Sequence, residues 1–115
     1  MDIRLLVLRT SDIETLAEFY SLIGLSFEYH SHGGSPYHYS ATIGQMVLEI
    51  YPLAKNQVKA DKNLRLGFSI DNFDAIIKLL KEKRVQFSSE PAQTEFGFMA
   101  IILDPDGRKI ELYQN

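Results

Sequence analysis

The chain has 115 residues, of which 45% are hydrophobic and 23% charged, a length and composition typical of one globular domain. It contains no cysteine, which excludes disulfides, thiolate nucleophiles and zinc–cysteine sites. A net charge of −3, with one tight basic cluster at Lys81, Lys83 and Arg84, argues against a nucleic-acid partner. Because the first residues lack a secretory-signal pattern and no apolar run approaches membrane-spanning length, we expect a cytoplasmic protein with no membrane partner.

The first half of the chain reads as a strand, a helix and three further strands. Ile3–Leu8 is a short apolar run, and Ser11 with Glu14 then has the pattern of a helix N-cap and capping box. Apolar residues recur at helical spacing up to Gly24, where we expect the helix to end. Runs rich in β-branched and aromatic residues predict strands at Leu25–Tyr29, Tyr37–Ile43 and Met46–Tyr51.

The same order of elements returns after a polar linker at residues 53–63. A strand at Leu64–Ile70 precedes a helix at Phe73–Glu82. Further strands are expected near Val85, at Phe98–Leu103 and at Arg108–Tyr113. The last two are joined by Asp104-Pro105-Asp106-Gly107, a strong turn signal because proline restricts φ and glycine accepts positive φ.

The two halves match each other along their whole length. A shift of about 60 residues aligns the helix starts, the apolar helix stripes and the strand ends. With about two extra residues in the second turn, Glu49-Ile50-Tyr51 lies on Glu111-Leu112-Tyr113. The sequence therefore predicts an α+β fold of two βαβββ units in one domain, covering about residues 1–52 and 64–115.

Strand alternation separates a buried face from an open one. Leu48, Ile50, Ile110 and Leu112 are expected to pack beneath the helices. The opposite, concave face then carries Glu49, Tyr51, Glu111 and Tyr113. In the strand at 64–70 the same face carries Arg65, Gly67 and Ser69, and small residues in mid-strand indicate a close approach and hence a cavity. Phe96, Phe98 and Met99 are expected in the core or the cavity wall.

The paired βαβββ units and the segment Asp104–Leu112 resemble the vicinal oxygen chelate superfamily of glyoxalases, bleomycin-resistance proteins and extradiol dioxygenases. Asp12-Ile13, Phe19-Tyr20 and Ile23-Gly24-Leu25 with Phe27 add to the resemblance, which covers nearly the whole chain. It implies a cup-like mixed sheet that holds a ligand and any divalent metal. Since relatives commonly form dimers, it also implies a homodimer.

The resemblance implies metal ligands on the first and last strand of each unit. Matched residue by residue, the last-strand positions are Glu49 and Glu111, and the first-strand positions are Leu5 and Arg65. Leucine has no donor atom and arginine stays protonated, so neither binds a cation. We therefore expect no cofactor; the alternative is a divalent metal bound by Glu49 and Glu111.

The leading hypothesis is a metal-independent protein that binds a small organic molecule. Arg65 takes over the charge of the metal, pairs with Glu49, Glu111 or both, and holds an anionic or carbonyl-bearing ligand beside Tyr51 and Tyr113. An arginine network that only satisfies buried charges is equally compatible with the residues. Two further alternatives stay open: a metal-dependent lyase or isomerase of the glyoxalase kind, and a dimeric interaction module with a vestigial cavity.

Three histidines, His30, His32 and His38, lie in one glycine- and proline-containing stretch and invite a metal or acid–base interpretation. We expect instead an exposed loop with solvated imidazoles. His38 is the exception, because it begins a strand beside the one that bears Glu49. We therefore include His38 among the ligand-binding residues, where it would lend a proton or a hydrogen bond.

Overall fold

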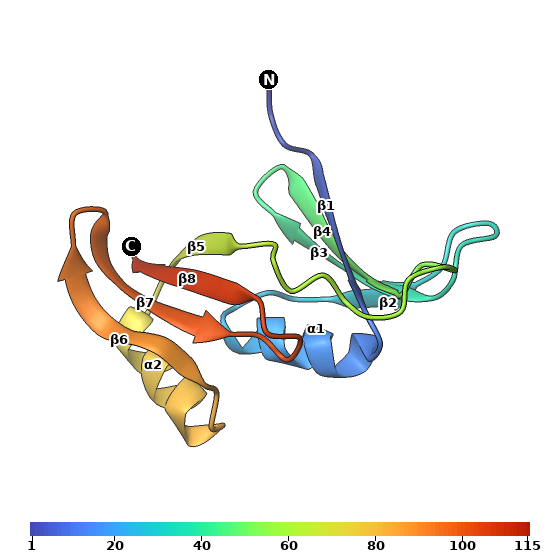
Figure 1. The fold of residues 1–115 in the computed structure, drawn as a ribbon. Helices are drawn as coiled ribbons and strands as arrows, with labels where there is room; N and C mark the ends of the chain where they lie inside the picture. Colours follow the sequence, from blue (N-terminus) through green and yellow to red (C-terminus); the bar gives the residue numbers. More distant parts are fainter. The chain divides into compact units, whose positions relative to one another are not determined.

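The computed structural model describes residues 1–115, which divide into two compact units, Met1–Ala60 and Asp61–Asn115. Each unit contains one helix and four strands (Figure 1). The boundary falls inside the predicted linker at residues 53–63. That the two units make up a single domain stays a prediction.

The first unit is a four-stranded mixed sheet with one helix. The strands β1 (Leu5–Thr10) and β4 (Met46–Pro52) are parallel neighbours, and β3 (His38–Ile43) runs antiparallel to β4. At the edge, β2 (Glu28–His30) pairs with β3, which gives the order β1-β4-β3-β2. The helix α1 (Ile13–Leu22) connects β1 to β2.

The second unit repeats this arrangement with the order β5-β8-β7-β6. Its parallel neighbours are β5 (Leu66–Ile70) and β8 (Lys109–Gln114), and its helix is α2 (Phe73–Glu82). The antiparallel strands are β6 (Phe87–Thr94) and β7 (Gly97–Leu103).

The register of the parallel pairs repeats as well. Val7 lies opposite Glu49 in the first unit, and Gly67 lies opposite Glu111 in the second. The two carboxylates therefore occupy equivalent positions in equivalent strands. The predicted α+β fold of two βαβββ units is confirmed.

Each unit has its own apolar core between its helix and one face of its sheet. Leu48 and Ile50 on β4, and Ile110 and Leu112 on β8, are fully buried, as the alternation predicted. The helices supply the other buried side chains: Leu16, Ala17, Phe19 and Tyr20 from α1, and Phe73, Ile77 and Leu80 from α2. Neither helix is long and apolar enough to cross a membrane.

The prediction that Ser11 caps the first helix is wrong, because Asp12 is the N-cap. Its Oδ1 accepts a hydrogen bond from the Thr15 amide at 3.1 Å, and its Oδ2 accepts one from the Thr15 hydroxyl at 2.7 Å. These two bonds lower the pKa of Asp12 below its usual range. A carboxylate at this position also suits the positive end of the helix dipole.

The sequence prediction also misplaced two edge strands. The strand expected near Val85 is β6, which begins at Phe87 and continues to Thr94. Most of β6 is polar and exposed and it contains Pro91, so it lacks the alternation of a half-buried strand; an edge position with register shifts accepts such a sequence. The strand expected at Leu25–Tyr29 is reduced to β2.

The predicted turn Asp104–Gly107 joins β7 to β8 around a buried ion pair. Oδ1 of Asp104 accepts from the amides of Asp106 at 2.9 Å and Arg108 at 3.0 Å. The Arg108 side chain is buried, and its Nη1 lies 3.1 Å from Asp104 Oδ2 and 3.0 Å from Asp106 Oδ2. This network holds together the turn that precedes β8.

Candidate functional site

The six predicted ligand-binding residues form two groups of three, one in each unit. Arg65, Glu111 and Tyr113 are in contact in the second unit. The first unit brings together the other three: His38, Glu49 and Tyr51. The prediction that one cavity is lined by both groups stays a prediction.

In the second unit, Glu111 is held by a cation and a phenol. Arg65 Nε donates to Glu111 Oε2 at 2.6 Å, and the Tyr113 hydroxyl donates to Oε1 of the same carboxylate. Glu111 and Tyr113 are two residues apart on β8, so both project from the face opposite the core. The predicted ion pair of Arg65 with Glu111 is confirmed.

These contacts alter the acidity of both β8 side chains. The hydrogen bond from Tyr113, followed by the bond and charge of Arg65, lowers the pKa of Glu111 despite its partial burial. The same hydrogen bond raises the pKa of Tyr113. At neutral pH the pair is therefore a carboxylate and a neutral phenol. A carboxylate with a lowered pKa is a poor general base, so its suitable role is to hold Arg65 in place.

This network borders a cavity of about 520 Å³ whose remaining wall is mostly apolar. The lining residues are Arg65, Thr94, Glu95, Phe96, Met99, Ile101, Glu111 and Tyr113. Met99 and Ile101 project from the open face of β7, whereas Phe98 points to the core and contacts Phe73 edge-on at 5.5 Å. A volume of this size suits a small organic ligand.

Thr94 and Glu95 had not been foreseen in this wall. Thr94 is the last residue of β6 and Glu95 follows it in the turn to β7, beyond the strand that was expected near Val85. Met99 agrees with the expectation of core or cavity wall, and Phe96 in the wall is 73% exposed.

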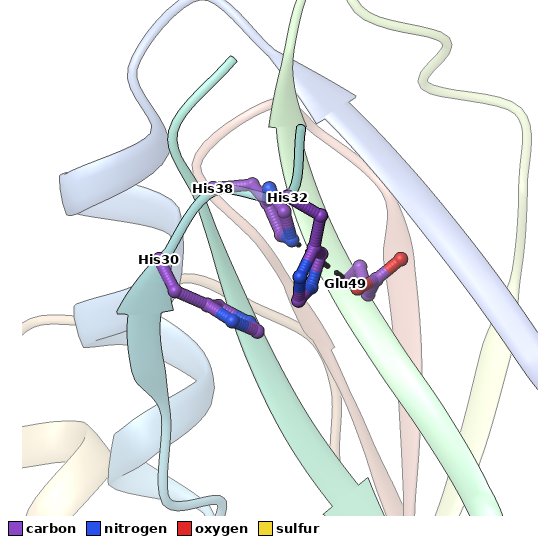
Figure 2. Close-up of side chains that lie close together, drawn as sticks. All are labelled: His30, His32, His38 and Glu49. Atoms are coloured by element: carbon purple, nitrogen blue, oxygen red, sulfur yellow. Dashed lines mark ion pairs between the residues drawn. The ribbon is translucent and has the colours of Figure 1, made fainter. Parts of the chain in front are cut away.

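In the first unit, His38 is completely buried at the start of β3. Its Nδ1 lies 3.0 Å from the Pro36 carbonyl oxygen, and its Nε2 lies 3.3 Å from Glu49 Oε2 (Figure 2). Its ring stacks on Tyr51 with centroids 4.2 Å apart, and the Arg9 guanidinium lies 5.1 Å from the centre of the same Tyr51 ring. Sequence alternation had predicted the Glu49–Tyr51 face but not Arg9.

The other two histidines join this group. The ring centroids of His30 and His32 are 4.4 Å apart, and those of His30 and His38 are 4.7 Å apart. One ligand atom from each of the three histidines and from Glu49 lies within 4.8 Å of the others (Figure 2). The expectation of an exposed loop with solvated imidazoles therefore agrees with the exposed His32 but not with His30, which is half-buried, while His38, the expected exception, is buried.

Strand register explains the convergence. His30 lies opposite His38, and Ser40, two residues farther along β3, lies opposite Glu49. Residues opposite one another, or two apart in one strand, share a face of the sheet. Given the β2–β3 pairing, the sequence is enough to deduce that these residues share a face, but the pairing itself was not predicted.

The metal positions implied by the family resemblance do not fit a cation. Leu5 offers no donor atom, and the Arg65 guanidinium is bonded to Glu111, one of the two carboxylates of that set. A fixed positive charge on a would-be ligand opposes a divalent ion. No chemistry is therefore assigned to a metal at these four positions.

Comparison with known proteins identifies the family. Residues 3–112 match the Glyoxalase/Bleomycin resistance protein/Dioxygenase superfamily, and the chain belongs to this family. None of the curated proteins matches the sequence.

Several solved structures share the fold. The antibiotic binding protein TnmS3 from Streptomyces sp. CB03234 is 24% identical, with a TM-score of 0.76 over 99% of this chain and 95% of that one. The oxidase ChaP-H2 is 16% identical, with a TM-score of 0.78 over 100% and 94% of the two chains. Lactoylglutathione lyase from Agrobacterium tumefaciens is 16% identical, with a TM-score of 0.71 over 99% and 93%. At these identities the likeness shows the fold alone.

Proposed function

We propose that this protein binds a small organic molecule and that the cavity of the second unit provides a binding surface which needs no metal. The observation that carries the proposal is the Arg65–Glu111–Tyr113 network at the border of a cavity with an apolar wall. The antibiotic-binding relative with the same fold supports binding as a function.

Arg65 is the anchor for the polar part of the ligand. It uses Nε to bond Glu111, and its side chain is 48% exposed, so the other N–H groups of the guanidinium can reach a ligand. The hydrogen bond from the Tyr113 hydroxyl fixes the Glu111 carboxylate, and the carboxylate in turn fixes the Arg65 guanidinium. A planar donor group held in this way suits a carboxylate, a sulfonate or a carbonyl oxygen.

The apolar wall determines the other part of the ligand. Met99 and Ile101 cover the surface beside the network, and Phe96 adds an exposed ring. Methionine adapts to ligands of different shape, and an aromatic ring favours flat ones. We therefore propose a ligand with an aromatic or otherwise apolar body and one anionic or carbonyl group.

A second candidate function is that of a metal-dependent lyase or isomerase of the glyoxalase kind. The observation that favours it is the contact between the buried His38 and Glu49, since histidine could supply ligands that Leu5 and Arg65 lack. In such enzymes a divalent ion polarises a substrate oxygen. The binding function is preferred because Glu111 is already held by Arg65 and Tyr113, without a metal ion.

The proposal is tested with two fluorescent probes that share one aromatic skeleton. 8-Anilinonaphthalene-1-sulfonate carries an anionic group, and N-phenyl-1-naphthylamine is neutral. Titrated in the presence of EDTA, the native protein is expected to bind the sulfonate at least about tenfold more tightly, because a charge-assisted hydrogen bond contributes on the order of 1.5–3 kcal/mol.

Arg65→Gln is expected to abolish this preference while leaving the affinity for the neutral probe unchanged. Arg84→Gln is the matched control, because Arg84 is exposed and does not line the cavity. A cooperative thermal melt of each variant excludes probe binding to a loosened fold. Equal preference for the sulfonate in the native protein and in Arg65→Gln would show that Arg65 is not the anchor, and a native protein that binds neither probe would remove the cavity proposal.

A further inference from the structure

The three histidines and Glu49 of the first unit form a set of metal-ligand types that the proposed function does not use. His30 ends β2, His32 lies in the following loop, His38 begins β3 and Glu49 is in mid-β4. One donor atom from each lies within 4.8 Å of the others. Three imidazole nitrogens and one carboxylate oxygen are typical ligands of Zn²⁺ and neighbouring divalent transition metals, whereas Mg²⁺ and Ca²⁺ favour sets of oxygen atoms.

Nε2 of His38 has no hydrogen-bond partner. The Pro36 carbonyl can only accept, so Nδ1 carries the proton of the bond between them, which is 3.0 Å long. In a neutral ring Nε2 then presents a lone pair to the Glu49 carboxylate, 3.3 Å away. A lone pair facing a carboxylate is unfavourable without a cation between them.

The same nitrogen is buried, and its approach to Glu49 does not have the direction of a hydrogen bond. The 3.3 Å distance qualifies as a charge contact, but Nε2 has no hydrogen-bond partner, so an imidazolium N–H aimed at the carboxylate is not what the geometry shows. Nε2 of His30 is likewise buried without a partner. Buried polar atoms in folded proteins are normally paired, so two unpartnered ring nitrogens in a cluster that also contains Glu49 point to a shared ligand.

The protein also supplies the support that metal-bound histidines need. The bond from Nδ1 to the Pro36 carbonyl fixes the tautomer and orientation of His38, and the stacked Tyr51 ring holds its plane. Pairing between β2 and β3 places His30 opposite His38. His32 is positioned by a turn in which its carbonyl accepts from the Ser35 amide and its amide donates to the Ser35 hydroxyl, both at 2.8 Å.

We propose that His30, His32, His38 and Glu49 bind one divalent transition-metal ion, with Zn²⁺ as the representative. The four donors all belong to the first unit, so this site differs from the first-and-last-strand set that the resemblance implies. Bonds of about 2.0–2.1 Å in a tetrahedron separate ligand atoms by roughly 3.4 Å. Nε2 of His38 and Oε2 of Glu49 are already 3.3 Å apart, and the other separations, which are at most 4.8 Å, must shorten by no more than about 1.4 Å. The exposed His32 provides that adjustment.

The site is tested by calorimetric titration of Zn²⁺ into protein that carries no histidine tag and has been stripped with EDTA and desalted. The native protein is expected to bind one ion per chain. Co²⁺ is a second probe, because its visible spectrum reports tetrahedral coordination. His32→Ala and Glu49→Gln are each expected to weaken Zn²⁺ binding at least about tenfold, since each removes one ligand.

Glu18→Gln is the matched control, since Glu18 is exposed on the helix of the same unit and does not belong to the cluster. Because His38 is buried and its variants risk unfolding, ring-nitrogen NMR of the native protein replaces them. Addition of Zn²⁺ is expected to shift Nε2 of His38 while Nδ1 keeps its proton.

Three results would overturn the proposal: no stoichiometric binding by the native protein, equal binding by His32→Ala, or loss of binding in Glu111→Gln, which would assign the ion to the family set. None of these measurements depends on Arg65 or on the fluorescent probes. The metal site and the small-molecule cavity can therefore fail separately.

Discussion

The carboxylate of Glu111 accepts hydrogen bonds from Arg65 and Tyr113, and both donors lower its pKa. Its pKa is lowered first by the hydrogen bond from Tyr113 and then by Arg65. A lowered folded-state pKa means that the contribution of Glu111 to folding is present above its ordinary value of 4.5 and is lost as the pH falls through the lower, folded-state value.

We expect Tyr113→Phe to raise the pKa of Glu111 toward that ordinary value, because the phenylalanine ring keeps the packing and removes the donor. A carboxyl-carbon NMR titration measures it, and the acid unfolding midpoint is expected to move to higher pH. Tyr37→Phe, at an exposed tyrosine of the first unit, is the control. An unchanged Glu111 pKa in Tyr113→Phe would mean that the phenol does not stabilise the carboxylate.

At the scale of the elements, two glycines of the second unit differ in their need for glycine. Gly67 in β5 has ordinary strand geometry, and a Cβ added there would meet the Tyr113 ring at 3.5 Å and Glu111 Cβ at 3.7 Å. The sequence indicated that another group lies close to this strand, and the Tyr113 ring is such a group. Gly107, in the turn before β8, has a φ of +91° that a side chain tolerates poorly.

We expect Gly67→Ala to keep or raise the free energy of unfolding, by up to about 1 kcal/mol, because the alanine fits and the unfolded chain loses freedom. Gly107→Ala is expected to lower it by about 1–2 kcal/mol through backbone strain. Urea unfolding of the two variants measures both changes. Equal destabilisation would show that the face of β5 has no room for a methyl group.

At the scale of the whole molecule, the segment that joins the units is a long stretch of irregular backbone. Residues 53–65 form neither helix nor strand, and Val58 is 92% exposed. A homodimer and a cytoplasmic location stay predictions, and a light-scattering mass twice that of the chain is the result expected for the dimer.

Brief trypsin treatment of the native protein is expected to cut first at Lys55, Lys59 or Lys62, because these backbone positions lack the regular hydrogen bonds that protect an element. Lys78, inside α2, is the internal comparison. Mass spectrometry of the earliest internal fragments identifies the site. A first cut in α2 would mean that the helix opens more readily than the segment between the units.

Much of the fold and part of the site could be predicted because they depend on local rules. Apolar alternation placed Glu49 and Glu111 opposite the core, and it placed Arg65 on the same face as Glu111, which Arg65 contacts. The β6 strand was expected too early in the chain, near Val85, because an edge strand need not alternate. Thr94 and Glu95 were therefore missed.

The sequence by itself determined the two βαβββ units, their buried faces and the turn before β8, because periodicity and turn chemistry act over a few residues. Only the tertiary structure decided that His30 and His32 meet His38 and Glu49. That meeting depends on the β2–β3 register and on the turn at His32–Ser35, because pairing between strands, and not the periodicity within one strand, decides which residues lie opposite one another. Histidines that the sequence suggested were mostly solvated in a loop are for this reason gathered around the buried His38 in the folded chain.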